Sequence, residues 1–201
     1  EFNSNQDNLK EIPFNNTKVY TKTFLLGTDK FGRDVLSRII VGSRISFYIG
    51  FVSVFISLVI GIFLGSLAGY YSGIIDTIIM WIINIVWSIP TLLLVIAISL
   101  ALGKGVWQVF LAVGLTMWVE VARLVRGQVK QYKERKFVVA AKVIGLSDMK
   151  IIFRHIIPNL TSSLIVISAT NFAASILIES GLSFLGIGVQ PPMSSWGLMI
   201  K

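Results

Sequence analysis

Cysteine is absent from the 201-residue chain, and histidine occurs once, at His155. A disulfide framework and a thiolate metal site are therefore excluded within this sequence. A phosphate-binding loop also needs Gly-x-x-x-x-Gly-Lys followed by Ser or Thr, whereas Gly103-Lys104-Gly105 lacks both the upstream glycine and the hydroxyl residue. We therefore expect no enzyme activity, no metal site and no cofactor in this chain.

Charge is scarce as well. Charged residues make up 14% of the chain, and Asp76 and Lys104 are the only ones between Ile45 and Val119. A soluble protein distributes charge over every exposed face, so this stretch is expected to lie in lipid. The hydrophobic content of 54% and the mean hydropathy of +0.78 agree with that expectation. The sequence predicts an all-α membrane protein.

Four apolar runs approach or exceed the roughly 20 helical residues that cross a hydrocarbon core. They are residues 45–70, 74–102, 106–125 and 160–178, with turns expected at 70–73 and 103–105. Pro90 lies inside the second run, where it should kink the helix and free a carbonyl that a neighbour must satisfy. Residues 1–44 are expected to form a polar segment outside this transmembrane domain of residues 45–201.

The distribution of Lys and Arg indicates the orientation. Nine of the 18 basic residues lie between Arg123 and Arg154, whereas the approach to the first span carries four, namely Lys30, Arg33, Arg38 and Arg44. By the positive-inside rule the larger cluster is cytoplasmic and residues 1–44 are extracytoplasmic. Membrane topology thereby accounts for the net charge of +8, and we expect no nucleic-acid partner.

The first span carries four glycines at every fourth position, Gly61, Gly65, Gly69 and Gly73. A helix face without side chains lets another helix approach closely, so we predict a packing seam there; a moving gate at this seam is the alternative.

Polar residues at membrane depth are candidates for a transport pathway or for helix contacts. We assign Asn84, Pro90 and Asn171 as candidate pathway residues. Glu120 has a local explanation, because Arg123 lies one turn further along the helix, and Glu179 is expected at the outer interface.

The basic stretch from Lys130 to Pro158 is predicted to form a helix, a break and a second short helix. Phe137, Ala140, Ala141 and Ile144 recur at helical spacing, and Gly145 stands where helices end in a left-handed residue. Ser147 or Asp148 would cap the second helix and Pro158 would end it. Because small side chains let a partner approach the backbone, we interpret the stretch as a docking surface; a helix lying on lipid headgroups is the alternative.

Three segments of the chain resemble one family. Val139-Ala-Ala-Lys-Val-Ile-Gly145, followed by Ile157-Pro158, resembles the EAA loop in permease subunits of binding-protein-dependent ABC importers, with Val139 in place of the family's glutamate. The segments 26–46 and 179–197 resemble the C-type permeases of peptide and nickel importers. Such subunits have six helices, so the resemblance implies that the first and sixth are missing from this chain.

The resemblance implies a permease subunit that forms half of a pathway for peptides or related solutes, including nickel chelates, in a bacterial cytoplasmic membrane. Its partners would be a homologous second permease, two cytoplasmic ATPase subunits that bind ATP and Mg²⁺, and an extracytoplasmic solute-binding protein. The coupling loop would be residues 127–158, with the ATPase-docking residues Glu134, Phe137, Val139, Ala140, Ala141, Ile144, Gly145, Leu146, Ser147, Asp148 and Pro158. Two alternatives stay open: an oligomeric passive channel, and a membrane anchor that recruits a cytoplasmic partner.

Overall fold

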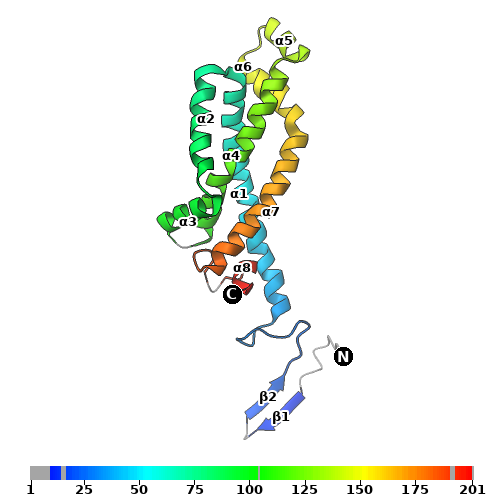
Figure 1. The fold of residues 1–201 in the computed structure, drawn as a ribbon. Coiled ribbons are helices and arrows are strands. Elements are labelled where there is room, and N and C mark those ends of the chain that lie inside the picture. Colours follow the sequence, from blue (N-terminus) through cyan, green and yellow to red (C-terminus); the bar gives the residue numbers. More distant parts are fainter. Residues whose placement is uncertain (1–9, 15–16, 104, 191–192, 201) are drawn as a thin grey trace.

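The computed structural model describes residues 10–14, 17–103, 105–190 and 193–200. It is an elongated bundle of helices, and a two-stranded hairpin lies beyond one end (Figure 1). The elements are β1 (Lys10–Phe14), β2 (Thr17–Thr21), α1 (Val35–Tyr71), α2 (Gly73–Ser88), α3 (Thr91–Leu102), α4 (Val106–Lys133), α5 (Lys136–Val143), α6 (Asp148–Lys150), α7 (Thr161–Phe184) and α8 (Trp196–Ile200). The helical membrane domain confirms the predicted fold class, whereas the antiparallel hairpin, with Lys10 opposite Thr21, was not predicted.

Local hydrogen bonds hold the segment before α1. The Asp34 carboxylate caps the helix by accepting from the N–H groups of Leu36 and Ser37, at 3.2 and 3.3 Å. Asp29 accepts from the N–H of Arg33 at 3.0 Å and pairs with its Nε at 2.8 Å. The hydroxyl of Ser37 also donates to Asp34, and this bond is the main reason why the pKa of Asp34 lies below its ordinary value of 3.8.

Within the described ranges, three helical segments are long and apolar enough to span a membrane: α1, α4 and the path from Asp148 to Phe184. The predicted span at 74–102 is instead divided into α2 and α3, which meet at an angle of 92°. With 16 residues, α2 extends only about 24 Å, and α3 turns away from the bundle axis (Figure 1). Pro90 causes the break, and the carbonyl of Val86 accepts from the N–H of Ile89 at 3.3 Å. The count of four spans therefore holds only if the bent pair is one span.

The predicted helix end at Pro158 is wrong. From α6 the chain continues through a π-helical turn (Ile151–Ile156) and a 3-10 turn (Ile157–Leu160) into α7. The N–H of Ile157 bonds to the carbonyl of Ile152, five residues back. Pro158 lies in the first turn of the 3-10 helix. The N–H groups of a first turn have no partner within the helix, so the missing N–H of proline costs no hydrogen bond there.

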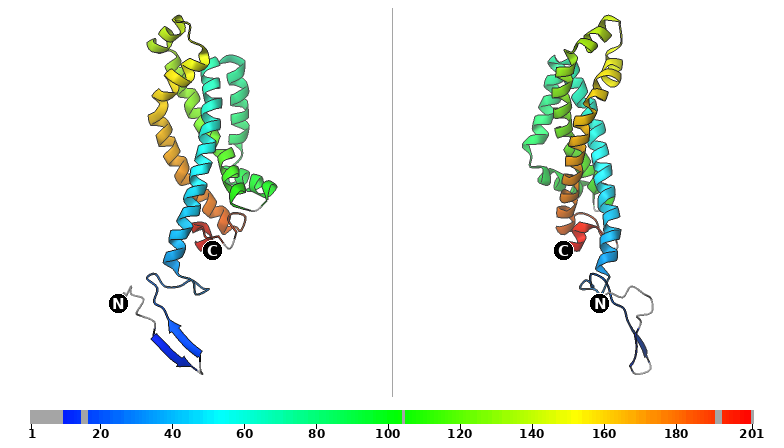
Figure 2. Two further views of the ribbon diagram at one scale, coloured as in Figure 1. Left: turned by 180° about the vertical axis from the view of Figure 1, so that it is seen from behind. Right: turned by 90° about the vertical axis from the view of Figure 1, so that its right-hand side faces the viewer.

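The longest helix, α1, buries mainly small residues and exposes many large ones. On α1, Ser53, Ser57 and Gly61 are buried, whereas Phe51 and Phe55 are 73% and 65% exposed. This arrangement suits lipid, which solvates large apolar side chains while small ones let helices approach. The helices α1, α4 and α7 lie side by side along the bundle in both views of Figure 2.

Candidate functional site

The basic loop forms one end of the bundle and has the predicted construction of helix, break and helix. The helix α5 ends at Val143, and Gly145, two residues further on, has a φ of +82°. The N–H of Leu146 bonds to the carbonyl of Ala141 at 3.1 Å and that of Gly145 to Lys142 at 2.9 Å, which is a Schellman motif. A β-carbon is disfavoured at that φ, so glycine suits the turn that sends the chain back toward the membrane.

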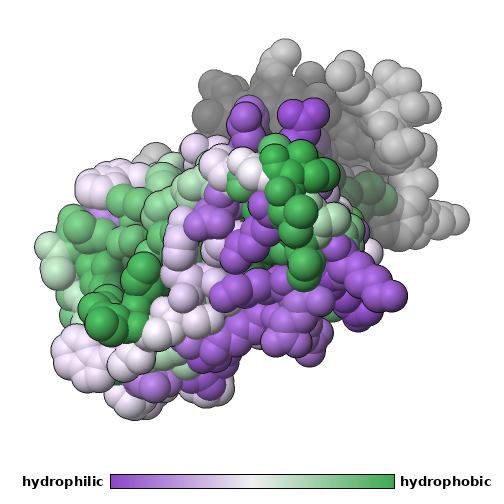
Figure 3. All heavy atoms as spheres, turned by 90° about the horizontal axis from the view of Figure 1, so that it is seen from above, coloured by the Kyte–Doolittle hydropathy of each residue, from purple (hydrophilic) through white to green (hydrophobic). Residues whose placement is uncertain are grey.

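Several predicted docking residues lie on the outside of the loop. Val139 and Phe137 are 50% and 42% exposed, and Ile144 is 78% exposed; Glu134, Ala140, Gly145, Ser147 and Pro158 are exposed too. Val143, which the sequence reasoning missed, is 82% exposed. A shallow groove of about 430 Å³ is lined by Val139, Ala140, Val143 and Ile144 together with Glu134 and Lys136. Seen from this end, hydrophobic and hydrophilic residues lie next to one another (Figure 3).

Three residues of the predicted docking set do not lie on that outer surface. Ala141 is buried, and it packs in a core with Val138, Ile151 and Ile152. Leu146 is half-buried against the same core, and the carboxylate of Asp148 faces inward. Helical spacing misassigned Ala141 because α5 is apolar on both faces, one toward solvent and one toward the core.

A hydrogen bond fixes the loop to the end of α1. The hydroxyl of Tyr70 donates to Asp148 at 2.7 Å, and Lys133 and Lys142 lie over the Tyr70 ring at 5.5 and 5.2 Å. The Tyr70 ring is buried in the core that contains Ala141. The sequence reasoning missed this contact, because 78 residues separate its two partners.

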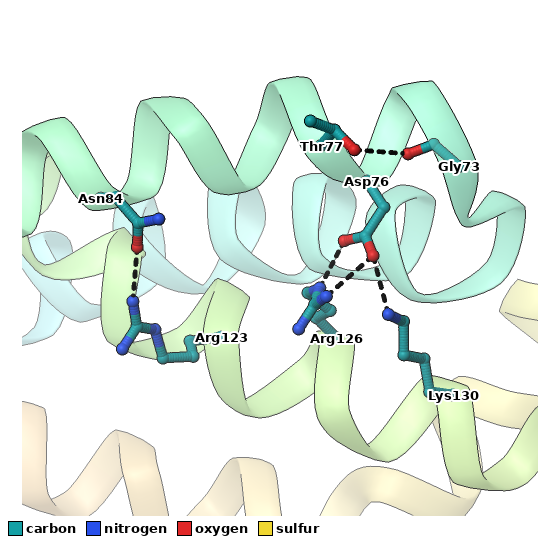
Figure 4. A network of polar contacts seen from close by, with 7 residues as sticks. All are labelled: Gly73, Asp76, Thr77, Asn84, Arg123, Arg126 and Lys130. Atoms are coloured by element: carbon teal, nitrogen blue, oxygen red, sulfur yellow. Dashed lines mark hydrogen bonds and ion pairs between the residues drawn. The ribbon is translucent and has the colours of Figure 1, made fainter.

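Polar contacts between α2 and α4 lie just below the loop (Figure 4). Asp76 on α2 pairs with Arg126 through both carboxylate oxygens, and with Lys130 at 2.7 Å. Two turns along, Arg123 donates to Asn84 at 2.8 Å and stacks on Trp87 at 3.7 Å. One feature of the sequence indicated this network, namely the single acidic residue, Asp76, in the apolar run of residues 74–102.

The contacts of Asn84 and Arg123 change two expectations. Arg123 reaches across to α2 and not along its own helix to Glu120. Asn84, a predicted pathway residue, accepts a hydrogen bond in a contact between two helices of the same chain.

The glycine face of α1 packs directly on α4. A β-carbon built on Gly61 would lie 2.5 Å from Val121 Cβ, one on Gly65 2.5 Å from the Ala122 carbonyl oxygen, and one on Gly69 2.7 Å from that of Arg126. Gly73 departs from the predicted seam. It begins α2 after the turn at Ser72, both residues have positive φ, and nothing lies within 4 Å of the position of its β-carbon.

A cavity of about 290 Å³ lies between the bend at Pro90, α4 and α7. Asn171 on α7 lines it and is 1% exposed, and neither atom of its side-chain amide has a hydrogen-bond partner. Ile89 and Thr91, on either side of Pro90, also line the cavity. Of the three predicted pathway residues, Asn171 and the Pro90 bend therefore meet at one cavity and Asn84 does not.

Glu179 is fully buried near the opposite end of the bundle, although it was expected at the outer interface. Its carboxylate accepts from the hydroxyls of Ser46 at 3.2 Å and Ser183 at 2.7 Å. Ser46 in turn accepts from the N–H of Trp196 at 3.3 Å, so this carboxylate connects α7, α1 and α8. Pro191 and Pro192, in the segment that resembles the family, lie outside the described residues, as does Lys104 in the turn before α4.

Comparison with known proteins identifies the family. Residues 61–201 match the family model of the binding-protein-dependent transport system inner membrane component. The chain belongs to this family. Membership confirms the membrane location and the resemblance predicted from the loop, and the family comprises transport components and not enzymes. In the part of the chain that the structure describes, no three His, Cys, Asp or Glu side chains gather as a metal site would require.

This family member is similar to permease proteins of peptide and glutathione transport systems. It is 40% identical over 185 residues to the oligopeptide transport system permease protein OppC of Bacillus subtilis, and 45% identical over 175 residues to OppC of Salmonella typhimurium. It is also 43% identical over 175 residues to the glutathione transport system permease protein GsiD of Escherichia coli. The matches cover 92%, 87% and 87% of this chain but 61%, 58% and 58% of the relatives.

The fold of this family member is similar to that of an inward-facing structure of the MetNI methionine ABC transporter. The TM-score is 0.65 at 18% identity, over 77% of each chain. At that identity the similarity concerns the fold, and it confirms the predicted transmembrane architecture.

Proposed function

We propose that this chain is the membrane-spanning permease subunit of an ATP-driven importer for peptides or related solutes, and that it forms half of the translocation pathway. The loop at residues 127–158 couples it to separate ATPases. The relatives named as oligopeptide and glutathione permeases support the class of solute. The nine basic residues from Arg123 to Arg154 support a cytoplasmic loop.

The construction of the loop carries this proposal. An exposed apolar surface on α5 is fixed from behind by a core that reaches α1 and α4 through the buried Tyr70 and Val129, and α7 through the partly buried Leu164. A partner that presses on α5 therefore acts on all three helices, because packed cores transmit displacement and do not absorb it. A helix that merely lay on lipid headgroups would not need this rigid support.

The proposed complex contains a homologous second permease, two cytoplasmic ATPase subunits and an extracytoplasmic solute-binding protein. ATP and Mg²⁺ are bound by the ATPases, since no motif in this chain is suited to them. The proposed docking residues are now Glu134, Phe137, Val139, Ala140, Val143, Ile144, Gly145, Ser147 and Pro158. Ala141, Leu146 and Asp148 support this surface from inside.

Replacement of Ile144 by Asp tests the docking surface. Burial of an isoleucine contributes about 1.5–3 kcal/mol, so the variant should bind the ATPases roughly 10- to 100-fold more weakly and import peptide more slowly. Gln131→Asp is the matched control, because it adds the same charge at an exposed position on the last turn of α4. Equal co-purification of the ATPases with both variants would contradict the proposed docking surface.

A further inference from the structure

The cavity beside the Pro90 bend has a polar lining that hydrogen bonds within the chain do not explain. Asn171 is buried there with both amide atoms unpaired. A buried amide without a partner is unfavourable, so such a side chain usually faces water or a ligand.

The other polar groups of the cavity offer acceptors. The hydroxyl of Thr116 donates to the carbonyl of Val113 at 2.8 Å, and that of Thr170 to Val166 at 3.1 Å. Both hydroxyl hydrogens are thus directed at their own helices, and the oxygens keep lone pairs. Both threonines line the cavity.

Of the described residues that line this cavity, Glu120 alone is charged. Among the described residues, no ion pair includes it, since Arg123 is held by Asn84 and Trp87. An unpaired carboxylate beside hydroxyl oxygens attracts a cation that can donate several hydrogen bonds. Apolar residues from α2, α3 and α7, including Leu94 and Ile178, complete the cavity lining, while Glu120 and Thr170 are themselves exposed.

We propose that this cavity is a binding site for a protonated primary amine, with Glu120 as the counter-ion and Asn171, Thr116 and Thr170 as hydrogen-bond partners. A primary ammonium has three donors and one positive charge, which matches the Glu120 carboxylate, the two hydroxyl oxygens and the Asn171 amide oxygen. The Asn171 amide nitrogen is a donor and needs an acceptor on the same ligand. If the proposed function holds, the ligand is the amino end of a peptide in transit, and a cavity of about 290 Å³ has room for that end.

Thiol labelling tests the site independently of transport. The chain contains no cysteine, so Thr170→Cys introduces its single thiol into the cavity lining. In the assembled complex, in vesicles of phosphatidylcholine and phosphatidylglycerol without aminolipids, we would measure its modification by cationic aminoethyl and anionic sulfonatoethyl methanethiosulfonate. The ratio of the two rates is divided by the same ratio for free mercaptoethanol.

We expect the cationic reagent to be favoured by roughly tenfold or more, as for other clefts lined by one sign of charge. Glu120→Gln should bring the ratio close to that of free thiol, and Glu120→Asp, which keeps the charge, should restore it. Excess trialanine should slow labelling, whereas N-acetyl-trialanine, which has no amine, should not. The proposed site would be overturned if the labelling ratio were the same with Glu120 and with Glu120→Gln. It would also be overturned if neither reagent modified the thiol.

Uptake of trialanine by the same vesicles separates the two proposals. ATP-dependent uptake without charge-selective labelling would leave the permease proposal in place and overturn the amine site. The opposite result is also informative. If labelling is charge-selective and depends on Glu120, but trialanine is neither taken up nor slows labelling, the cavity is a cation site and its assignment to peptides is overturned.

Discussion

Replacement of Gly65 by alanine should separate α1 from α4. The added β-carbon would lie 2.5 Å from the carbonyl oxygen of Ala122 and 3.0 Å from its Cα. Both are backbone atoms, so no side-chain rotation relieves the clash and one helix must move relative to the other. The effect should therefore be large for the addition of one methyl group.

Two opposing contributions set the size of this effect. Overpacking of a filled interface costs about 1–3 kcal/mol. Alanine in place of glycine within a helix contributes about 0.5–1 kcal/mol of stability. Gly127 on α4 provides the control, because nothing lies within 4 Å of the position of its β-carbon and Gly127→Ala gains only the second contribution. The two variants should differ by about 1–3 kcal/mol in free energy of unfolding.

The measurement is reversible unfolding in mixed detergent micelles, followed by circular dichroism, for both variants and the parent chain. Gly65→Ala should unfold at lower denaturant than the parent and Gly127→Ala at equal or higher denaturant. If Gly65→Ala were as stable as Gly127→Ala, the close contact between α1 and α4 would not exist in the membrane protein.

Three further predictions concern the loop, the ionic network and the segment before α1. Asp76→Asn should lower the free energy of unfolding by about 1–2 kcal/mol, measured by thermal unfolding. The loss is smaller than for a fully buried ion pair because Lys130 is 39% exposed. Asp76→Glu keeps the charge and should lower the free energy of unfolding less. Ala141→Leu overfills the core behind α5 and should increase proteolysis of the loop, whereas Ala140→Leu, at an exposed position, should not. Because the folded pKa of Asp34 is below 3.8, its contribution to stability is complete above that pH and is lost as pH falls through the lower, folded value. Amide protection of Leu36 and Ser37, corrected for intrinsic exchange, should follow this pattern, and Asp34→Asn should remove the pH dependence while keeping the cap.

Features that depend on local chemistry could be predicted from the sequence. Gly145 follows the end of α5 in a left-handed turn as predicted, since the Schellman turn involves only residues 141–146. The break at Pro90 follows from the missing N–H, but its angle of 92° depends on the packing of α3 against α4, which no local rule specifies. Gly73 shares the spacing of the glycine seam and yet lies beyond the helix end at Ser72.

Features that depend on distant partners were missed or misassigned. Tyr70 meets Asp148 across 78 residues, and Asp76 meets Arg126 across 50. Ala141 was placed on the docking surface because the spacing of apolar residues does not distinguish a face toward a partner from a face toward the core. Glu120 was paired with Arg123 by helical spacing, whereas Arg123 finds a better partner on α2.

These contacts divide the chain into a rigid part and a jointed part. Backbone approach at Gly61, Gly65 and Gly69 joins α1 to α4, and the core behind α5 joins the loop to both helices. In contrast, α2 and α3 are connected through the break at Pro90, and the cavity with Asn171 lies at that joint. Under the proposed function, force applied to α5 moves α1 and α4 together, and the joint between α2 and α3 is where relative motion costs least. A cavity at such a joint changes shape when the helices move, so an amine bound there would be held in one state of the transporter and released in the other.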